Sequence, residues 1–260
     1  MYNILKTYWK TLLFFAVIGL VGGFFTGIYV LDSYPADIQQ QIIEEMNASG
    51  LGQFPVDTLI GIITAIQSAG YGIVLGALGI WLGKKIGLWK EERTIEKKPL
   101  LWAVVIAIVG GMGIIVPDLV FFGKYSQAIM DSYAVKPTVP YLIAMVTYGG
   151  VIEEVMLRLF MMSLLAFIIH WFCRKKYEKT AIWMLVAANV ISAVLFAAGH
   201  LPTTAVVLGL SPVIVFRCFL LNGSFGLLFG WLYRKYGLRY AMIAHGGCHV
   251  ISKLIWILFI

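Results

Sequence analysis

Charged side chains are scarce in this sequence, since Asp, Glu, Lys and Arg make up only 13% of its 260 residues while 60% are hydrophobic. The mean hydropathy is +0.88. So few charges exclude a soluble globular domain, which normally carries roughly twice this share. We predict an all-α polytopic integral membrane protein, a helical bundle of seven or eight transmembrane helices, because helices satisfy their backbone hydrogen bonds internally in lipid.

Cysteine pairs and repeats are also lacking, and no removable leader is expected. The three cysteines, Cys173, Cys218 and Cys248, are far apart and form no CxxC pair, which excludes a disulfide framework and a cysteine metal site. No internal repeat is present of the kind that many transporters show. The first apolar stretch, Thr11 to Leu31, is too long for a signal peptide and lacks a small-residue cleavage site, so we expect a retained anchor.

Long apolar runs are what the sequence does have. Seven of them can cross roughly 30 Å of hydrocarbon. They cover residues 11–31, 57–82, 100–122, 141–172, 180–200, 212–233 and 240–260. A short apolar piece at 203–211 is predicted to be re-entrant or an extra short helix, and residues 32–56 are predicted to be an exposed external connector.

Basic residues predict the orientation of the chain. They gather around residues 6–10, 84–98, 174–179 and 234–239, whereas the alternate loops hold only Lys124 and Lys136. Positive charge in short loops stays on the cytoplasmic side, so the amino terminus is predicted cytoplasmic. The net charge of +7 is thus explained by topology and predicts no nucleic-acid partner.

Two adjacent glutamates lie inside the fourth apolar run. An ionisable side chain at this depth costs roughly 2.5 to 3.5 kcal/mol, so Glu153 and Glu154 each need a reason. Glu154 can pair with Arg158 four residues later, as a structural support. That pair leaves Glu153 without a partner.

Three histidines at apolar depth could supply a partner for Glu153. His200 ends the fifth run, while His245 and His249 lie one turn apart on one face of the last helix. Any one of them alone is explained as a buried imidazole that joins neighbouring helices. A carboxylate and three imidazoles together predict a polar intramembrane cavity with the parts for attack of water on an amide.

These residues form three motifs, in order and in separate predicted helices. The motifs are Glu153-Glu154-x-x-x-Arg158, Phe196-x-x-x-His200 and His245-x-x-x-His249. Together they resemble the type II CAAX prenyl protease and bacteriocin-processing family (CPBP or Abi). On this resemblance residues 141–260 are expected to form the catalytic core, and residues 1–140 the amino-terminal transmembrane helices and loops.

The resemblance implies an intramembrane endopeptidase that hydrolyses a peptide bond of a membrane-associated protein or peptide. Glu153 would be the general base that takes a proton from water, and His200 would position that water. His245 and His249 would donate hydrogen bonds to the oxyanion. Such a chain is expected in the lipid bilayer of a bacterial plasma membrane.

One departure from the family pattern opens a second mechanism. The family generally has Asn where this chain has His249. A shell of Glu153, His200, His245 and His249 could then bind zinc, although the glutamate between the histidines of helical zinc motifs is missing. We favour the metal-independent glutamate mechanism, with no cofactor firmly implied and zinc as the alternative.

Two other classes of function stay open. A non-catalytic membrane scaffold or bacteriocin-immunity protein would keep the polar residues for assembly, and a proton-coupled transporter would use them as a proton relay.

The predicted topology poses a difficulty for a site that contains both His200 and His245. With simple alternation of spans, His200 falls near the outer end of its helix and His245 near the inner end of the last one.

Overall fold

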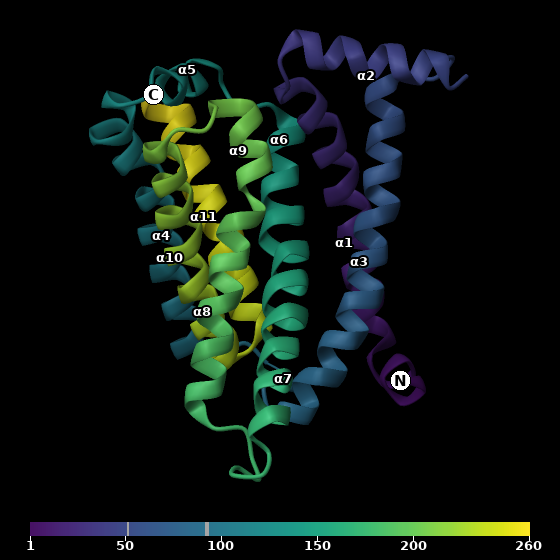
Figure 1. Ribbon diagram of the computed structural model, residues 1–260, viewed down its shortest axis with the longest axis vertical. Coiled ribbons are helices and arrows are strands. Elements are labelled where there is room, and N and C mark those ends of the chain that lie inside the picture. The colour runs from purple at the N-terminus through teal and green to yellow at the C-terminus, as the bar shows by residue number, and fades with distance from the viewer. Residues whose placement is uncertain (51, 92–93) are drawn as a thin grey trace.

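The computed structural model describes residues 1–50, 52–91 and 94–260, and every regular element within these ranges is a helix. Seven helices are long and apolar enough to cross a membrane, and Figure 1 shows how they are arranged. The predicted all-α fold is therefore confirmed, with seven spans. Residue 51 of the predicted connector and residues 92 and 93 of the predicted basic loop lie outside the described residues.

The helices follow one another through short connections. Their bounds are α1 (Tyr2–Ser33), α2 (Ala36–Ala48), α3 (Val56–Ile86), α4 (Lys97–Val120), η1 (Phe122–Lys124), α5 (Gln127–Ala134), α6 (Val139–Ala144), η2 (Met145–Glu153), η3 (Val155–Met162), α7 (Ser163–Cys173), α8 (Ile182–Gly199), α9 (Leu201–Leu208), α10 (Pro212–Tyr236) and α11 (Leu238–Phe259). The predicted apolar runs fall largely within these helices. Most helices extend beyond the runs, because hydropathy marks only the lipid-depth part.

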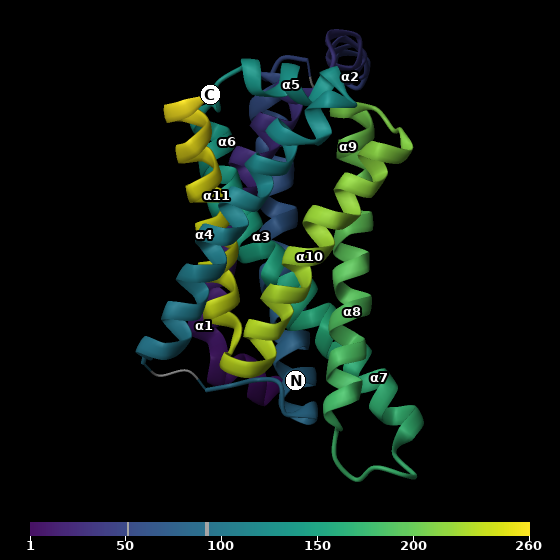
Figure 2. The ribbon, with the colours of Figure 1, turned by 90° about the vertical axis from the view of Figure 1, so that its left-hand side faces the viewer.

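The basic regions share one end of the bundle. The amino terminus and the connections α3–α4, α7–α8 and α10–α11 lie at that end, whereas α2, α5 and the carboxyl terminus lie at the other (Figures 1 and 2). This segregation agrees with the charge pattern of the sequence. The assignment of the basic end to the cytoplasm stays a prediction.

The connector between α1 and α3 contains the amphipathic helix α2, none of whose residues is buried. It lies across the end of the α1–α3 pair (Figure 1). Such a helix is suited to the membrane–water boundary. The predicted exposed connector is thus observed, with more regular structure than expected.

The fifth span does not end at His200. This residue keeps helical dihedral angles (φ −85°, ψ −14°) and joins α8 directly to α9, so the two form one membrane-length helix over residues 182–208. The short apolar piece is therefore the extra helix α9 and not a re-entrant loop. His200 consequently lies inside a longer helix, which removes the topological difficulty.

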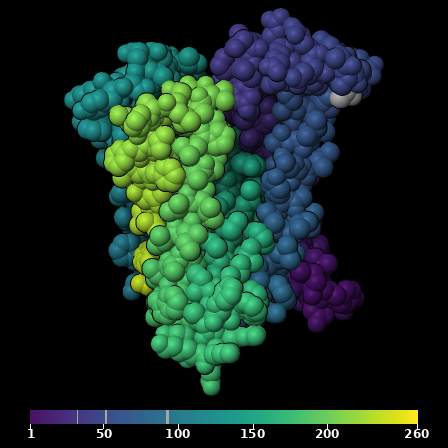
Figure 3. All heavy atoms as spheres, in the orientation of Figure 1, coloured from purple at the N-terminus to yellow at the C-terminus, as the bar shows by residue number. Residues whose placement is uncertain are grey.

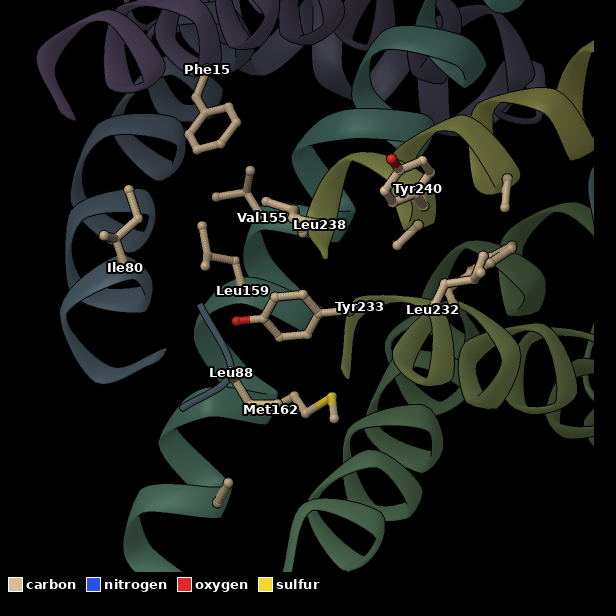
Figure 4. Packing of buried hydrophobic residues seen from close by; sticks show 14 of the residues in the cluster. Phe15, Ile80, Leu88, Val155, Leu159, Met162, Leu232, Tyr233, Leu238 and Tyr240 are labelled. Atoms are coloured by element: carbon tan, nitrogen blue, oxygen red, sulfur yellow. The ribbon is translucent and has the colours of Figure 1, made fainter. Parts of the chain in front are cut away.

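Packing in the bundle interior relies on close contact between large and small residues. Figure 4 shows Leu159 and Met162 beside the ring of Tyr233, whose hydroxyl lies 3.0 Å from Ser163 Oγ. At Gly230 an added Cβ would lie 1.8 Å from Asn189 Oδ1. The Asn189 amide thus occupies the space beside Gly230, and small residues at such contacts are common between membrane helices.

The fourth span has an unusual backbone. Its central part consists of two consecutive π-helical segments, η2 and η3, with Glu154 at their junction. π-helical turns are rare and often occur at functional sites. Both glutamates and Arg158 thus lie on a wider helix than the sequence predicted.

A second buried ion pair joins α4 to α10. Arg217 Nε and Nη2 each lie 2.5 Å from an oxygen of the fully buried Asp118, and the hydroxyl of Tyr133 donates to the same carboxylate. Arg217 therefore pairs within the bundle, as a buried membrane arginine usually does.

Candidate active site

The two adjacent glutamates have different surroundings. The Glu154 side chain is completely buried, whereas that of Glu153 is 19% exposed. Glu153 is also 3.9 Å from its nearest basic nitrogen, His245 Nε2. Of the two carboxylates, Glu153 is thus the one that water or a substrate can reach.

Glu154 is held by two basic residues. Its Oε1 lies 2.9 Å from His245 Nδ1 and 3.1 Å from Arg158 Nη1. The Arg158 guanidinium also lies over the rings of Phe196 and Phe229, at 4.4 and 5.4 Å. Glu154 therefore contacts Arg158 at the expected spacing and also contacts His245, which the sequence did not predict.

The contact with Glu154 fixes the hydrogen positions on the two histidines of α11. A carboxylate only accepts hydrogen bonds, so the proton of a neutral His245 is on Nδ1 and its Nε2 is an acceptor. His249 Nε2 lies 3.2 Å from His245 Nε2 and therefore carries a proton that it donates. The imidazole of His245 is further held by stacking on Phe229 at 4.6 Å.

The gap between Glu153 and His245 has the size of a water bridge. An oxygen and a nitrogen 3.9 Å apart are too distant for a direct hydrogen bond, but one water can contact both. In that position the water would face a carboxylate and an imidazole acceptor. This is the pair of groups that general-base activation of water needs.

His200 stands apart from this pair. Its Nδ1 lies 2.8 Å from the carbonyl oxygen of Phe196, on its own helix. The centre of the Phe196 ring lies 4.7 Å from that of His200 and 5.8 Å from that of His245. Within the described residues His200 makes no ion pair with Glu153, and their predicted pairing stays a prediction.

The predicted zinc shell is not assembled in this structure, and zinc stays an untested alternative. Zinc ligands converge to roughly 2.0–2.2 Å from one ion. Among residues 1–50, 52–91 and 94–260, no group of three or more His, Cys, Asp or Glu is placed to hold a metal ion.

Residues 135–251 match a family model, which is described as type II CAAX prenyl endopeptidase Rce1-like. This part of the chain is thus similar to that family. The match includes all the site residues described above and agrees with the resemblance seen in the motifs. No curated protein and no solved structure matches the chain.

Two glycines set the distance between the helices that carry the site of this Rce1-like region. A Cβ at Gly150 of η2 would lie 2.8 Å from the Cα of Gly246 on α11, and one at Gly149 would lie 3.0 Å from His249 Nε2. Close helix packing therefore explains the glycines at these two positions. Glu153 and His245 approach each other because of it.

We expect Gly150→Ala to separate η2 from α11 and thereby lower both the midpoint of thermal unfolding and the activity. The methyl group would meet backbone, which cannot rotate away. Gly70→Ala is the matched control, because a Cβ at Gly70 of α3 meets nothing within 4 Å. Thermal unfolding of the purified variants in detergent checks the prediction, and equal effects of the two substitutions would contradict it.

Sequence reasoning missed the aromatic walls of the site. Phe196 and Phe229 contact both Arg158 and His245. Phe196 precedes His200 by one turn in its motif, which is a weak signal for such a role. Phe229 has no signal in the sequence, because only the packing of α10 against the site brings it there.

Proposed function

We propose that this protein is an intramembrane endopeptidase that hydrolyses a peptide bond by a metal-independent glutamate mechanism. The observation that carries the proposal is that the two adjacent glutamates differ in exposure and in their contacts. Glu153 is accessible and faces His245 Nε2, while Glu154 is buried against His245 Nδ1 and Arg158. The match of residues 135–251 to a family of prenyl endopeptidases supports it.

In the first step Glu153 takes a proton from the bridging water, and the resulting hydroxide attacks the carbonyl carbon of the substrate. His245 Nε2 accepts the second hydrogen bond of that water and thereby orients it, a role that replaces the oxyanion donor expected for His245 from the sequence. This contact replaces the hydrogen bond that His249 donates to His245 in the structure. The His249 Nε2–H then becomes free for the carbonyl oxygen.

In the second step the tetrahedral intermediate collapses. The His249 donor stabilises the oxyanion, a contribution of roughly 3 to 4 kcal/mol for one donor. Glu153 returns its proton to the leaving nitrogen, so the products are a carboxylic acid and an amine. We keep His200 as a second group that holds the water.

The substrate class is a membrane-associated protein or peptide. In Figure 3 the molecular surface is hollowed between α8–α9 and α3, with α6 and η2 at the floor of the hollow. A substrate peptide lying in the bilayer could approach the fourth span from this side. We further propose a bacterial plasma membrane and a cytoplasmic amino terminus, on the charge pattern alone.

The experiment is cleavage of a library of membrane peptides by the purified protein in detergent, with products identified by mass spectrometry. We expect cleavage with and without a zinc chelator. Loss of cleavage on chelation would replace the glutamate mechanism by a zinc one. A well-folded protein that cleaves no peptide would favour a scaffold or immunity protein, and peptide-independent flux driven by a pH gradient would favour a transporter.

A further inference from the structure

The proposed hydrolysis has one assigned donor for the oxyanion. His245 Nε2 accepts a hydrogen bond from the bridging water, so it does not donate, and the Nε2–H of His249 is left to contact the oxyanion alone. Oxyanion holes of other hydrolases combine several donors, from backbone N–H groups or from Asn, Tyr and His side chains. A second donor on another helix would complete this site.

Tyr148 of η2 is brought to the side of Glu153 by the π-helical backbone. Both residues belong to the segment Met145–Glu153. Residues five apart are about one turn apart in a π-helix, whereas in an α-helix, with about 3.6 residues per turn, they lie on different faces. The backbone of Tyr148 is also held by α1, since a Cβ at Gly22 would lie 2.7 Å from the Tyr148 nitrogen. The unusual course of η2 therefore places a phenol beside the proposed base.

The Tyr148 hydroxyl is near Glu153 but is bonded to neither this residue nor another. Its side chain is half-buried and interacts electrostatically with Glu153 and with Tyr71 of α3. In the part of the chain that the structure describes, no hydrogen bond is found for this hydroxyl. Tyrosine hydroxyls inside a protein usually have a partner, so this one is available to a ligand.

Tyr148 and the His249 donor border the same gap. His245 Nε2 lies 3.9 Å from Glu153 Oε2 and 3.2 Å from His249 Nε2. Gly149, the neighbour of Tyr148 in the chain, packs against His249, because a Cβ there would lie 3.0 Å from His249 Nε2. In this gap a peptide carbonyl would lie between η2 and α11, each with one donor.

We propose that Tyr148 is a catalytic residue whose hydroxyl donates the second hydrogen bond to the oxyanion. This inference rests on the proposed function. A phenol is protonated at neutral pH and donates one hydrogen bond. Tyr148 keeps its proton in both steps, while Glu153 alone takes and returns a proton, so the proton balance of the hydrolysis is unchanged. The hydroxyl has no contact to break before it turns to the substrate, which makes it a donor that is ready before the reaction.

The test compares the wild type with Tyr148→Phe on two peptides that differ in one atom. The cleaved bond is an amide in one and a thioamide in the other, and sulfur is a weak hydrogen-bond acceptor. The purified full-length protein is placed in nanodiscs of zwitterionic lipid. We expect Tyr148→Phe to lower kcat for the amide by about 100-fold with little change in KM, as for the loss of one oxyanion donor. The thioamide should lose far less, so the ratio of the two kcat/KM values should fall at least about tenfold.

A phosphinic peptide gives a second readout of the same contact. Its P–O⁻ group takes the place of the oxyanion, so its inhibition constant should rise in Tyr148→Phe by a factor similar to the fall in kcat/KM. The midpoint of thermal unfolding should stay at the wild-type value, because the hydroxyl that is removed has no partner among the described residues.

Two further tyrosines locate the effect. Tyr29→Phe is the matched control, because Tyr29 of α1 is also half-buried and its ring centre lies 4.4 Å from that of Tyr141, which precedes Glu153 by twelve residues. Tyr71→Phe removes the other hydroxyl near Tyr148. Both variants should keep the wild-type ratio of amide to thioamide cleavage.

Amide cleavage by Tyr148→Phe within a few-fold of the wild type would overturn the inference and leave the proposed function standing. A slow Tyr148→Phe with an unchanged ratio and inhibition constant would overturn it as well, since the hydroxyl would then act on the water or on Glu153. A ratio that falls in Tyr71→Phe instead would place the donor on α3, and the inference would be wrong. Absence of any cleavage by the wild type would refute the proposed function, and the inference would fall with it.

Discussion

Glu153→Gln is expected to reduce kcat by at least about 100-fold with little change in KM. The amide has nearly the shape of the carboxylate but cannot take a proton from water, and a positioned general base contributes roughly 10² to 10⁴ in rate. The measurement is the initial rate of peptide cleavage by purified protein. Because Glu153 is partly exposed and 3.9 Å from its nearest basic nitrogen, the substitution should leave the unfolding midpoint unchanged.

The control for this variant is Glu178→Gln, which changes an exposed glutamate in the α7–α8 connection. It removes the same charge from the protein but lies far from the site at the basic end of the bundle. Glu178→Gln should cleave as the wild type does. A Glu153→Gln protein that keeps its activity within a few-fold would remove Glu153 from the chemistry.

Arg158→Met is expected to destabilise the protein by about 3 to 5 kcal/mol, because it leaves the buried charge of Glu154 without its strongest partner. Both side chains of this ion pair are almost fully buried, at 2% and 0% exposure. Methionine preserves much of the contact with Phe196 and Phe229. The loss should therefore come from charge, and denaturant unfolding in detergent measures it.

The double variant Glu154→Gln with Arg158→Met separates charge from packing. It removes both buried charges, so it should regain a large part of the stability that the single variant loses. Lys175→Met, at an exposed position of the α7–α8 connection, should leave stability unchanged. A double variant no more stable than Arg158→Met alone would show that the loss does not come from the uncompensated Glu154 charge.

The spans of this fold could be predicted because hydropathy and basic loops act locally. Apolar runs of 20 or more residues gave the seven helices, and the basic clusters gave their alternation. The end of the fifth helix was placed wrongly. His200 looked like a terminus, but its helical dihedral angles carry α8 into α9, and no single residue in the sequence signals that continuation.

The polar residues of the site could also be found from the sequence, because charge at bilayer depth is costly and therefore rare. Their contacts could not be predicted. The contacts of His245 and Arg158 with Glu154, and the contact of the Phe196 ring with His245, depend on how three separate spans pack. The π-helical course of η2 and η3 has no periodic signal in the sequence, and it sets which way Glu153 faces.

The most direct test of the account is hydrolysis of a membrane peptide in water enriched in ¹⁸O, with a zinc chelator present. The amino-side product is weighed by mass spectrometry. The account predicts one ¹⁸O atom in the new carboxyl group, formed by the wild type and not by Glu153→Gln. A product without ¹⁸O, an equal yield from Glu153→Gln, or loss of the product on chelation would contradict it.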